Sequence, residues 1–264
     1  MSATYLDEIM AFHRARSAQD TRAWRDRLPL TSPPRSLRRA LIDHRSSGIA
    51  VIAEIKRRSP SRGWLAPDLD AVVTARAYVE GGASAISVLT DGEFFGGSLA
   101  DLSDVATHVD VPILRKDFTV SANDVLAAVE AGAGAILLIA AALEHAELVA
   151  LLDVAGLVGI DALVEVHDED EAQRVIDAGA SLVGINQRDL RTFDVDPKRA
   201  ERVVAKLPAS IVTVAESGFS RVDAVRRAAA VGFDAVLVGE QFVTSPSPAT
   251  AVREFVGGPI GSRA

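Results

Sequence analysis

Short apolar stretches alternate with amphipathic stretches along the chain from about residue 49 onward. Runs rich in Val, Ile and Leu predict buried strands, and apolar residues spaced three or four apart predict helices. The predicted strands lie near residues 49–55, 84–89, 111–115, 134–139, 161–166, 181–185, 211–215 and 234–238. The predicted helices lie near residues 69–80, 99–107, 121–131, 143–155, 168–178, 197–206, 220–230 and 248–256.

Glycine marks the boundary between several predicted helices and the strands that follow them. Gly82, Gly132, Gly179 and Gly232 occupy such positions, and glycine there fits the left-handed residue that commonly closes a helix. Eight successive strand–helix units predict an α/β fold of the (β/α)8 TIM-barrel type, whose usual length is ~250 residues. A doubly wound open sheet is the alternative, but the first strand–helix turn lacks its GxGxxG loop.

The segment before the first strand predicts two helices, at residues 2–28 and 35–46, separated by prolines. We therefore expect a single domain over residues 1–264. It would comprise an N-terminal helical extension (1–47), the barrel (48–257) and a short tail (258–264).

Composition narrows the class of protein. The net charge is −8 and no stretch is strongly basic, which argues against a nucleic-acid partner. No apolar run approaches the length of a membrane helix, and the N-terminus lacks the basic region of a secretory signal. Cysteine is absent, which suits the cytoplasm. We expect a monomer, with a weak homodimer as the alternative.

Metal and thiol chemistry are not expected from this composition. Without cysteine there are no thiolate ligands, and the five histidines are scattered without HxxxH or HxH spacing. We therefore expect no metal site.

Polar residues gather at the ends of the predicted strands, where TIM-barrel enzymes place their chemistry. On the first strand Glu54 and Lys56 share a face, because alternate residues point the same way. Lys116, Glu165 and Glu216 end later strands. Each residue alone is more often a solvated rim residue. Two lysines and three acids at one end of one barrel instead predict a set of proton donors and acceptors.

Glycines after the seventh and eighth predicted strands suggest a phosphate site. Gly218 and Gly239 belong to the pair of loops that often binds phosphate in this fold, and Arg188 offers a charge-assisted contact. The alternative is that both glycines merely form tight turns.

Three phenylalanines follow the second and third predicted strands. Phe94, Phe95 and Phe118 either line an apolar pocket for a ring or anchor loops.

These residues occur in seven motifs that resemble those of the indole-3-glycerol phosphate synthase family of tryptophan biosynthesis. The motifs are AEIKRRSPS (53–61), SVLTDGEFFGGS (87–98), LRKDF (114–118), LVEVH (163–167), INQRDL (185–190), AESG (215–218) and VGE (238–240). Their order and their positions along the barrel make the resemblance specific, and it covers nearly the whole chain. Gln187 departs from it, since many relatives carry Asn there, but it should point away from the site.

The resemblance implies a carbon–carbon lyase (a carboxy-lyase) that needs no metal or organic cofactor. It would convert 1-(o-carboxyphenylamino)-1-deoxyribulose 5-phosphate into indole-3-glycerol phosphate, carbon dioxide and water. Lys116 would be the general acid, Glu165 the acid or base of dehydration, and Lys56 the partner of the substrate carboxylate. The resemblance assigns supporting roles to Glu54, Asn186, Glu216 and Ser217, substrate or phosphate contacts to Ser59, Arg188, Gly218, Gly239 and Glu240, and the anthranilate pocket to Phe95, Phe118, Leu137 and Leu190.

Two other functions remain open at this point. One is another phosphate-binding barrel enzyme, such as phosphoribosylanthranilate isomerase, which does not need the set of Lys56, Lys116 and Glu165. The other is a catalytically silent barrel that binds a phosphorylated metabolite.

Overall fold

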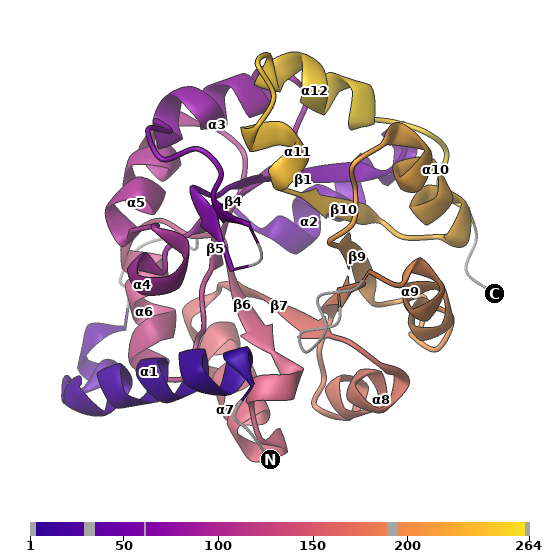
Figure 1. Cartoon of the computed structure of the whole chain (residues 1–264). Helices are drawn as coiled ribbons and strands as arrows, with labels where there is room; N and C mark the ends of the chain where they lie inside the picture. The colour runs from indigo at the N-terminus through magenta and orange to yellow at the C-terminus, as the bar shows by residue number, and fades with distance from the viewer. Residues whose placement is uncertain (1–3, 29–34, 61, 189–194, 262–264) are drawn as a thin grey trace.

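Eight parallel strands close into a barrel with helices arranged around it (Figure 1). The computed structural model describes residues 4–28, 35–60, 62–188 and 195–261. Around the barrel, neighbouring strands follow the chain from β1 to β4 and on to β10, which pairs back with β1. The barrel strands are β1 (Ala50–Ile55), β4 (Ala85–Leu89), β5 (Ile113–Lys116), β6 (Ala135–Ile139), β7 (Asp161–Val166), β8 (Leu182–Asn186), β9 (Val212–Glu216) and β10 (Ala235–Val238). The predicted TIM barrel is confirmed.

Helices connect the strands and cover the outside of the barrel. They are α3 (Ala71–Glu80), α5 (Leu99–His108), α6 (Ala122–Glu130), α7 (His145–Val158), α8 (Glu169–Asp177), α9 (Pro197–Val204), α10 (Val222–Val231) and α12 (Pro248–Phe255). The glycines predicted to close helices do adopt left-handed backbone, with φ of 97° at Gly82, 91° at Gly132, 84° at Gly179 and 100° at Gly232.

The alternation of side chains along each strand creates two apolar cores. Ile52, Leu114, Leu163 and Leu237 point inward and fill the barrel. The residues between them point outward and pack under the helices. Because both faces of a parallel strand are buried, the strands read as nearly continuous apolar runs. The inner core also closes the barrel beneath the strand ends.

The first helix of the extension is shorter than the sequence predicts. Helix α1 (Tyr5–Gln19) ends where Asp20 turns to extended backbone, with φ −86° and ψ 92°. The Asp20 carboxylate accepts hydrogen bonds from the backbone N–H and the guanidinium of Arg22, and such local bonds compete with helical ones. The chain resumes as the 3-10 turn η1 (Trp24–Arg27). The predicted helix over 2–28 is therefore wrong beyond Gln19.

The second helix of the extension plugs the N-terminal end of the barrel. In α2 (Leu37–His44), followed by the 3-10 turn η2 (Arg45–Ser47), Leu37 and Leu41 are fully buried and belong to the inner core. At the start of β7, Asp161 accepts hydrogen bonds from the Ser36 hydroxyl and the Arg38 backbone N–H, each at 2.7 Å. The proposed division into extension, barrel and tail stays a prediction.

Five short elements in the loops after barrel strands were not predicted from the pattern. Strands β2 (Arg58–Ser59) and β3 (Gly63–Trp64) form a hairpin after β1. Helix α4 (Gly92–Phe95) follows β4, and helix α11 (Glu240–Val243) follows β10, while the 3-10 turn η3 (Ala140–Ala142) follows β6. Stretches of two to four residues are too short to carry a hydrophobic period.

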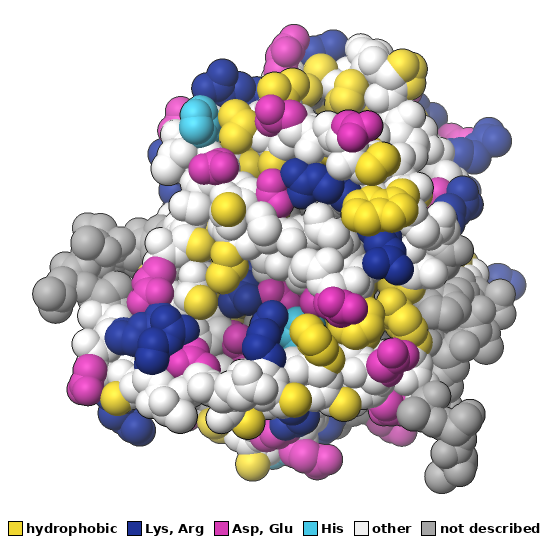
Figure 2. Space-filling model, turned by 60° about the vertical axis from the view of Figure 1, so that its left-hand side comes forward, with side chains coloured by type: hydrophobic (Ala, Val, Ile, Leu, Met, Phe, Trp, Pro, Cys, Tyr) yellow, Lys and Arg dark blue, Asp and Glu magenta, His cyan; other side chains and the backbone are white. Residues whose placement is uncertain are grey.

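The surface mixes both charges. On the face drawn in Figure 2, acidic and basic side chains are interspersed. None of the described helices combines the length and the hydrophobicity that crossing a membrane requires.

We expect Leu41→Ala to lower the free energy of unfolding by about 2–5 kcal/mol, because it opens a cavity in the plug of the barrel. Urea unfolding followed by circular dichroism would measure the loss. The matched control is Leu157→Ala on α7, where the leucine is 62% exposed and the change should be within about 0.5 kcal/mol. Equal effects of the two substitutions would contradict the role of Leu41 as a plug.

Candidate active site

The C-terminal ends of the barrel strands surround a cavity of about 480 Å³. Of the residues predicted to form the site, those within the described part of the chain line this cavity: Glu54, Lys56, Ser59, Phe95, Lys116, Phe118, Leu137, Glu165, Asn186, Arg188, Glu216, Ser217, Gly218, Gly239 and Glu240. Leu190 lies outside the described residues. The barrel thus brings distant strand ends together, while the function of each residue stays a prediction.

Lys116 stands between two carboxylates at the end of β5. Its Nζ is 3.4 Å from Glu165 Oε2 and 3.7 Å from Glu216 Oε2. Burial alone would lower the pKa of the ammonium, but Glu165, Glu216 and Glu54 outweigh burial and raise the pKa above its usual range. The side chain keeps 17% of its surface exposed. Lys116 is therefore held as a cation, with a proton to donate to whatever occupies the cavity.

Glu165, at the end of β7, is held in its charged form. Its Oε1 accepts a hydrogen bond from Asn186 Nδ2 at 3.3 Å and lies 3.4 Å from His167 Nε2. Burial would raise the pKa of this carboxyl, but Lys116, His167 and Asn186 together lower it below its usual range. A buried carboxylate with these partners therefore stays ionised.

His167 lies against Glu165 on the side away from Lys116, and no role was predicted for it. Its Nδ1 lies 3.1 Å from Glu171 Oε2 at the start of α8, and the same oxygen accepts its backbone N–H at 2.8 Å. Burial would lower the pKa of the imidazole, but Glu165 and Glu171 raise it to about 10. The four-residue spacing to Glu171 was the available signal. The His167 imidazole thus lies between the carboxylates of Glu165 and Glu171, which favour its charged form.

Glu216, at the end of β9, behaves differently from Glu165. Burial raises its pKa, the charge of Glu165 adds to this, and Lys116 opposes it. Gly184 on the neighbouring strand makes room for it, since a Cβ there would collide with Glu216 Oε1. Two carboxyls whose environments push their pKa values apart are the usual arrangement of an acid–base pair.

Glu54 and Lys56 form a close ion pair at the end of β1. Lys56 Nζ donates to Glu54 Oε1 at 2.6 Å. Gly239, at the end of β10, leaves space for this pair. A Cβ built on Gly239 would lie 2.5 Å from Glu54 Oε1 and 3.2 Å from Lys56 Nζ. The absence of a side chain at position 239 therefore leaves room in the cavity for the Glu54–Lys56 pair.

The loop after β9 has a strained backbone. Ser217 is the one non-glycine residue with a positive φ, 68°, in the described part of the chain, and Gly218 follows with φ 79°. The Ser217 hydroxyl donates to Asn186 Oδ1 at 2.8 Å, and the Arg188 backbone N–H donates to the same oxygen at 3.0 Å. Such conformations cost about 1–3 kcal/mol and cluster at functional sites.

The predicted substrate or phosphate contacts Ser59 and Glu240 differ in whether their side chains already have partners. The buried Ser59 hydroxyl has no hydrogen-bond partner among the described residues, so it is available to a ligand. The Glu240 carboxylate lies 2.9 Å from Arg62 Nη1. Gln187 is outside the lining, as expected, and its amide donates to the Ser217 carbonyl at 3.2 Å.

The phenylalanines divide between the two expected roles. Phe95 and Phe118 line the cavity, with ring centroids 6.1 Å apart. Phe94 instead makes edge contacts with Tyr5 and Phe12 of α1, at 5.9 and 5.6 Å. It anchors the extension.

Sequence reasoning missed the contribution of α1 to this site. Tyr5, Leu6 and Ile9 line the cavity, although they precede β1 by more than one helix. His13, on the same helix, lies with Asp91 and Asp117 in the one group of potential metal ligands found among the described residues.

Comparison with known proteins identifies the family. A family profile described as "Indole-3-glycerol phosphate synthase" matches residues 5–255. The chain belongs to the indole-3-glycerol phosphate synthase family. Proteins of that name from Mycobacteroides abscessus and from a Parafrankia species are 50% and 46% identical to it. The first match covers 80% of this chain and 78% of the relative, and the second covers 95% and 94%.

Family membership confirms the predicted activity. Indole-3-glycerol phosphate synthase is a carboxy-lyase of tryptophan biosynthesis that acts on a phosphorylated small molecule. The isomerase alternative is therefore set aside.

Solved structures of lower identity show the fold alone. A 3-hexulose-6-phosphate synthase from Salmonella typhimurium superimposes with a TM-score of 0.63 at 14% identity, covering 78% of this chain and 96% of that one. A thiamine phosphate pyrophosphorylase from Pyrococcus furiosus gives 0.59 at 16% identity, covering 80% and 95%.

We expect His167→Gln to lower the free energy of unfolding in a pH-dependent way. The imidazole has a raised pKa, so its stabilisation is complete below its ordinary value of 6.5 and is lost as pH rises towards about 10. The difference between the parent and His167→Gln should therefore be largest near pH 6 and shrink at alkaline pH. Urea titrations at several pH values would measure it.

The control for this substitution is His145→Gln, at an exposed position on α7. Its free energy of unfolding should stay within about 0.5 kcal/mol of the parent value, as is usual for an exposed position. A constant difference between the parent and His167→Gln across the whole range would argue against a charged imidazole at position 167.

Proposed function

We propose that Lys116, Glu165 and Glu216 carry out the proton transfers of indole-3-glycerol phosphate synthesis. The observation that supports this most strongly is the partly buried Lys116 ammonium within 4 Å of two carboxylates whose pKa values shift in opposite directions. Ring closure, decarboxylation and dehydration all require proton transfer, and positioned acids and bases each contribute about 10²–10⁴-fold to the rate.

Lys116 acts as the general acid of ring closure. The ring carbon that bears the carboxylate attacks the ketone carbon, and the ketone oxygen takes a proton from Nζ to become a hydroxyl group. Negative charge develops on that oxygen beside a fixed cation, where a low dielectric strengthens the attraction. Loss of carbon dioxide then returns the bonding electrons to the ring.

Glu165 and Glu216 serve the dehydration. One carboxylate removes a proton from the carbon that lies between the nitrogen and the former ketone carbon. One acid protonates the hydroxyl group on the former ketone carbon, so that it leaves as water. Glu165, held ionised, suits the base. Glu216, whose pKa is raised, suits the acid or the proton reservoir. Asn186 and Ser217 orient Glu165 through the bonds that link Ser217 Oγ, Asn186 and Glu165 Oε1.

Lys56 binds the substrate carboxylate. Its ammonium is paired with Glu54 at 2.6 Å and keeps 18% of its surface exposed. A second carboxylate approaching from the cavity would share this cation until it leaves as carbon dioxide. Glu54 thus positions the ammonium.

The phosphate binds at the loops after β9 and β10. Gly218 and Gly239 let backbone N–H groups approach an oxyanion, and Arg188 and Ser59 line the same cavity. The Glu240 side chain is held by Arg62, so this residue contributes its peptide N–H. The anthranilate ring lies on the opposite side, against Phe95, Phe118 and Leu137, with Leu190 as a further proposed wall residue.

We further propose that the reaction needs no metal or organic cofactor and that the protein works as a monomer in the cytoplasm. Steady-state turnover of the carboxyphenylamino-deoxyribulose phosphate in the presence of EDTA, followed by indole fluorescence, tests the first point. Binding of this substrate without turnover would favour the silent barrel. Sedimentation equilibrium tests the oligomeric state.

We expect Lys116→Ala to fold and to lose at least about 10²-fold in kcat, the contribution of one positioned acid. Glu165 keeps His167 and Asn186 as partners in this variant, so the barrel should still form, as circular dichroism would verify. Lys198→Ala on α9 is the matched control and should keep the parent kcat. A Lys116→Ala enzyme with near-parent kcat would remove Lys116 from the mechanism.

We expect Gly239→Asp to raise KM at least about tenfold, equivalent to ~1.4 kcal/mol of binding free energy. The new carboxylate would crowd the Glu54–Lys56 pair and repel the phosphate. Inhibition by inorganic phosphate should weaken in parallel. The control is Gly156→Asp on α7, where a Cβ meets no atom within 4 Å. An unchanged KM in Gly239→Asp would place the phosphate elsewhere.

A further inference from the structure

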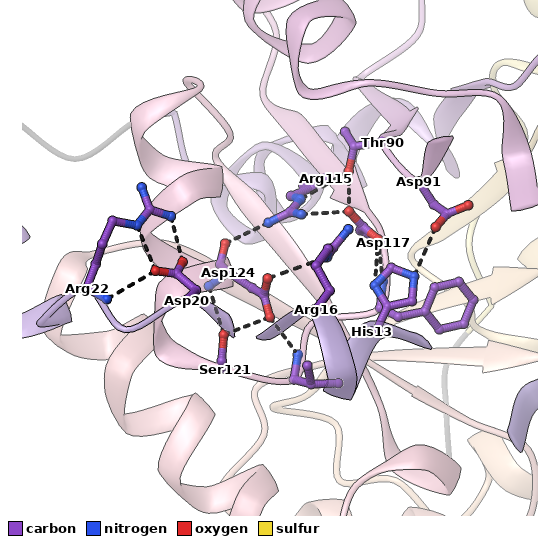
Figure 3. A network of polar contacts seen from close by, with 12 residues as sticks. His13, Arg16, Asp20, Arg22, Thr90, Asp91, Arg115, Asp117, Ser121 and Asp124 are labelled. Atoms are coloured by element: carbon purple, nitrogen blue, oxygen red, sulfur yellow. Dashed lines mark hydrogen bonds and ion pairs between the residues drawn. The ribbon is translucent and has the colours of Figure 1, made fainter. Parts of the chain in front are cut away.

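His13 is a buried titratable side chain that the reaction scheme does not use. It lies on α1 and is fully buried. Its Nε2 is 2.9 Å from Asp91 Oδ2, and its Nδ1 is 3.8 Å from Asp117 Oδ1. Figure 3 shows the imidazole between these two carboxylates. A polar ring with no exposed surface needs such partners, because burying it without them is costly.

The two carboxylates belong to two different loops at the rim of the active site. Asp91 follows β4, and its Oδ1 caps α4 by accepting the backbone N–H groups of Phe94 and Phe95, at 2.6 and 3.1 Å. Asp117 directly follows Lys116, and its Oδ1 accepts the backbone N–H of Phe118 at 2.8 Å. His13 therefore ties α1 to the loops that carry Phe95 and Phe118, the second of which directly follows Lys116.

The same three residues have the spacing of a metal site, since their ligand atoms lie within 4.8 Å of one another. Their hydrogen bonds argue against one. Both Asp91 oxygens are used, by the α4 N–H groups and by His13. Asp117 Oδ2 accepts the Thr90 hydroxyl and the Arg115 guanidinium, both at 2.6 Å. A divalent cation would have to displace these donors and sit beside the Arg115 charge.

The negative charge on Asp117 is well maintained. Burial would raise the pKa of this carboxyl, but Arg115, Thr90, His13 and the Phe118 N–H together lower it. The hydrogen-bond donors and the positive charge around Asp117 thus compensate for the burial of its carboxylate.

Apart from His13, helix α1 is held by ring contacts with Phe94, by partly exposed ion pairs of Arg14 and Arg16, and by a small apolar face. Its buried residues are Ile9, Met10 and His13, a small apolar interface for a helix of 15 residues. The ion pair from Arg14 to Glu147 of α7 is about half exposed, at 44% and 35%, and exposed pairs contribute little. Yet Tyr5, Leu6 and Ile9 of this helix line the active-site cavity.

His13 also touches the wall of the cavity directly. Its ring centroid is 5.1 Å from that of Phe118, the residue proposed to face the anthranilate ring. The His13 side chain therefore contacts both Asp91, in the loop after β4, and Phe118, in the aromatic wall of the cavity.

We propose that His13 is a positioning residue for the reaction: held between Asp91 and Asp117, it docks helix α1 on the rim of the active site and orients Phe118. It acts on binding of the aromatic substrate and takes no part in proton transfer. The proposal rests on the location of the active site proposed above.

The test compares three substitutions of His13. His13→Leu fills a similar volume without a polar atom, and His13→Asn is too short to reach Asp91. His13→Gln places its amide nitrogen near the position of Nε2 and can still donate to Asp91. We expect KM to rise about tenfold or more for Leu and Asn, the loss of one charge-assisted contact, with kcat within about threefold of the parent. His13→Gln should recover most of the parent KM.

The control is His44→Leu on α2, at the opposite end of the barrel, where the imidazole contacts Ser84 Oγ at 3.3 Å. It should leave KM unchanged, so that loss of a partly buried histidine is not by itself the cause. A fall in kcat at unchanged KM in the His13 variants would overturn the proposal, as would equal KM values for Gln and Leu. If His13→Leu does not fold, the contrast between Asn and Gln decides the matter.

Limited proteolysis measures how firmly helix α1 is docked, independently of catalysis. Trypsin cleavage after Arg14 and Arg16, located by mass spectrometry, should be faster in His13→Leu than in the parent or His13→Gln. Equal rates in all three would refute docking by His13, whereas a failure of Lys116 as the catalytic acid would leave this result intact. A rise in melting temperature with Zn²⁺ or Mn²⁺ in the parent, absent in His13→Leu, would replace this proposal with a metal site.

Discussion

A lysine ammonium enclosed by carboxylates is the interaction on which the active site depends. Removing such ions from water costs several kcal/mol each, and Lys116, Glu165 and Glu216 offset one another at 3.4–3.7 Å. Their charges are therefore interdependent: the cation lowers the pKa of Glu165, while burial and the charge on Glu165 raise the pKa of Glu216. The protein holds a donor and an acceptor of protons side by side because each stabilises the other.

The barrel supplies the conditions that this cluster needs. The inner apolar core, with Leu114 and Leu163 one layer below Lys116 and Glu165, keeps water out from beneath, and a low dielectric strengthens every charge contact above it. Space is provided by glycine, because at Gly184 and Gly239 a side chain would collide with Glu216 or with the Glu54–Lys56 pair. Because the parallel strands all end at the same rim of the barrel, their last side chains meet in one cavity.

Much of this fold is predictable from the sequence, because buried parallel strands and the glycines that close helices leave strong local patterns. The strand-end side chains follow from the alternation of residues, which places Glu54 on the face of Ile52. Other features depend on distant contacts. The hairpin β2–β3 and helices α4 and α11 are too short to have a period, and His13 meets a partner 78 residues away in the chain. The opposite pKa shifts of Glu165 and Glu216 likewise depend on contacts between strands, because Lys116 and Asn186 help to lower the first, while burial and the charge of Glu165 raise the second.

The extension holds the barrel at both ends, and the two contacts differ in kind. Helix α2 inserts Leu37 and Leu41 into the inner core, which is a large and apolar contact. Helix α1 rests on a small apolar interface, on its ring contacts with Phe94 and on His13. The turn η1 is tied to α6 by the ion pair of Arg27 and Glu130. Since Tyr5, Leu6 and Ile9 face the cavity, a substrate that contacts them adds to the weaker of the two interfaces. Docking of α1 and binding of the substrate are then linked, so each must strengthen the other by the same free energy.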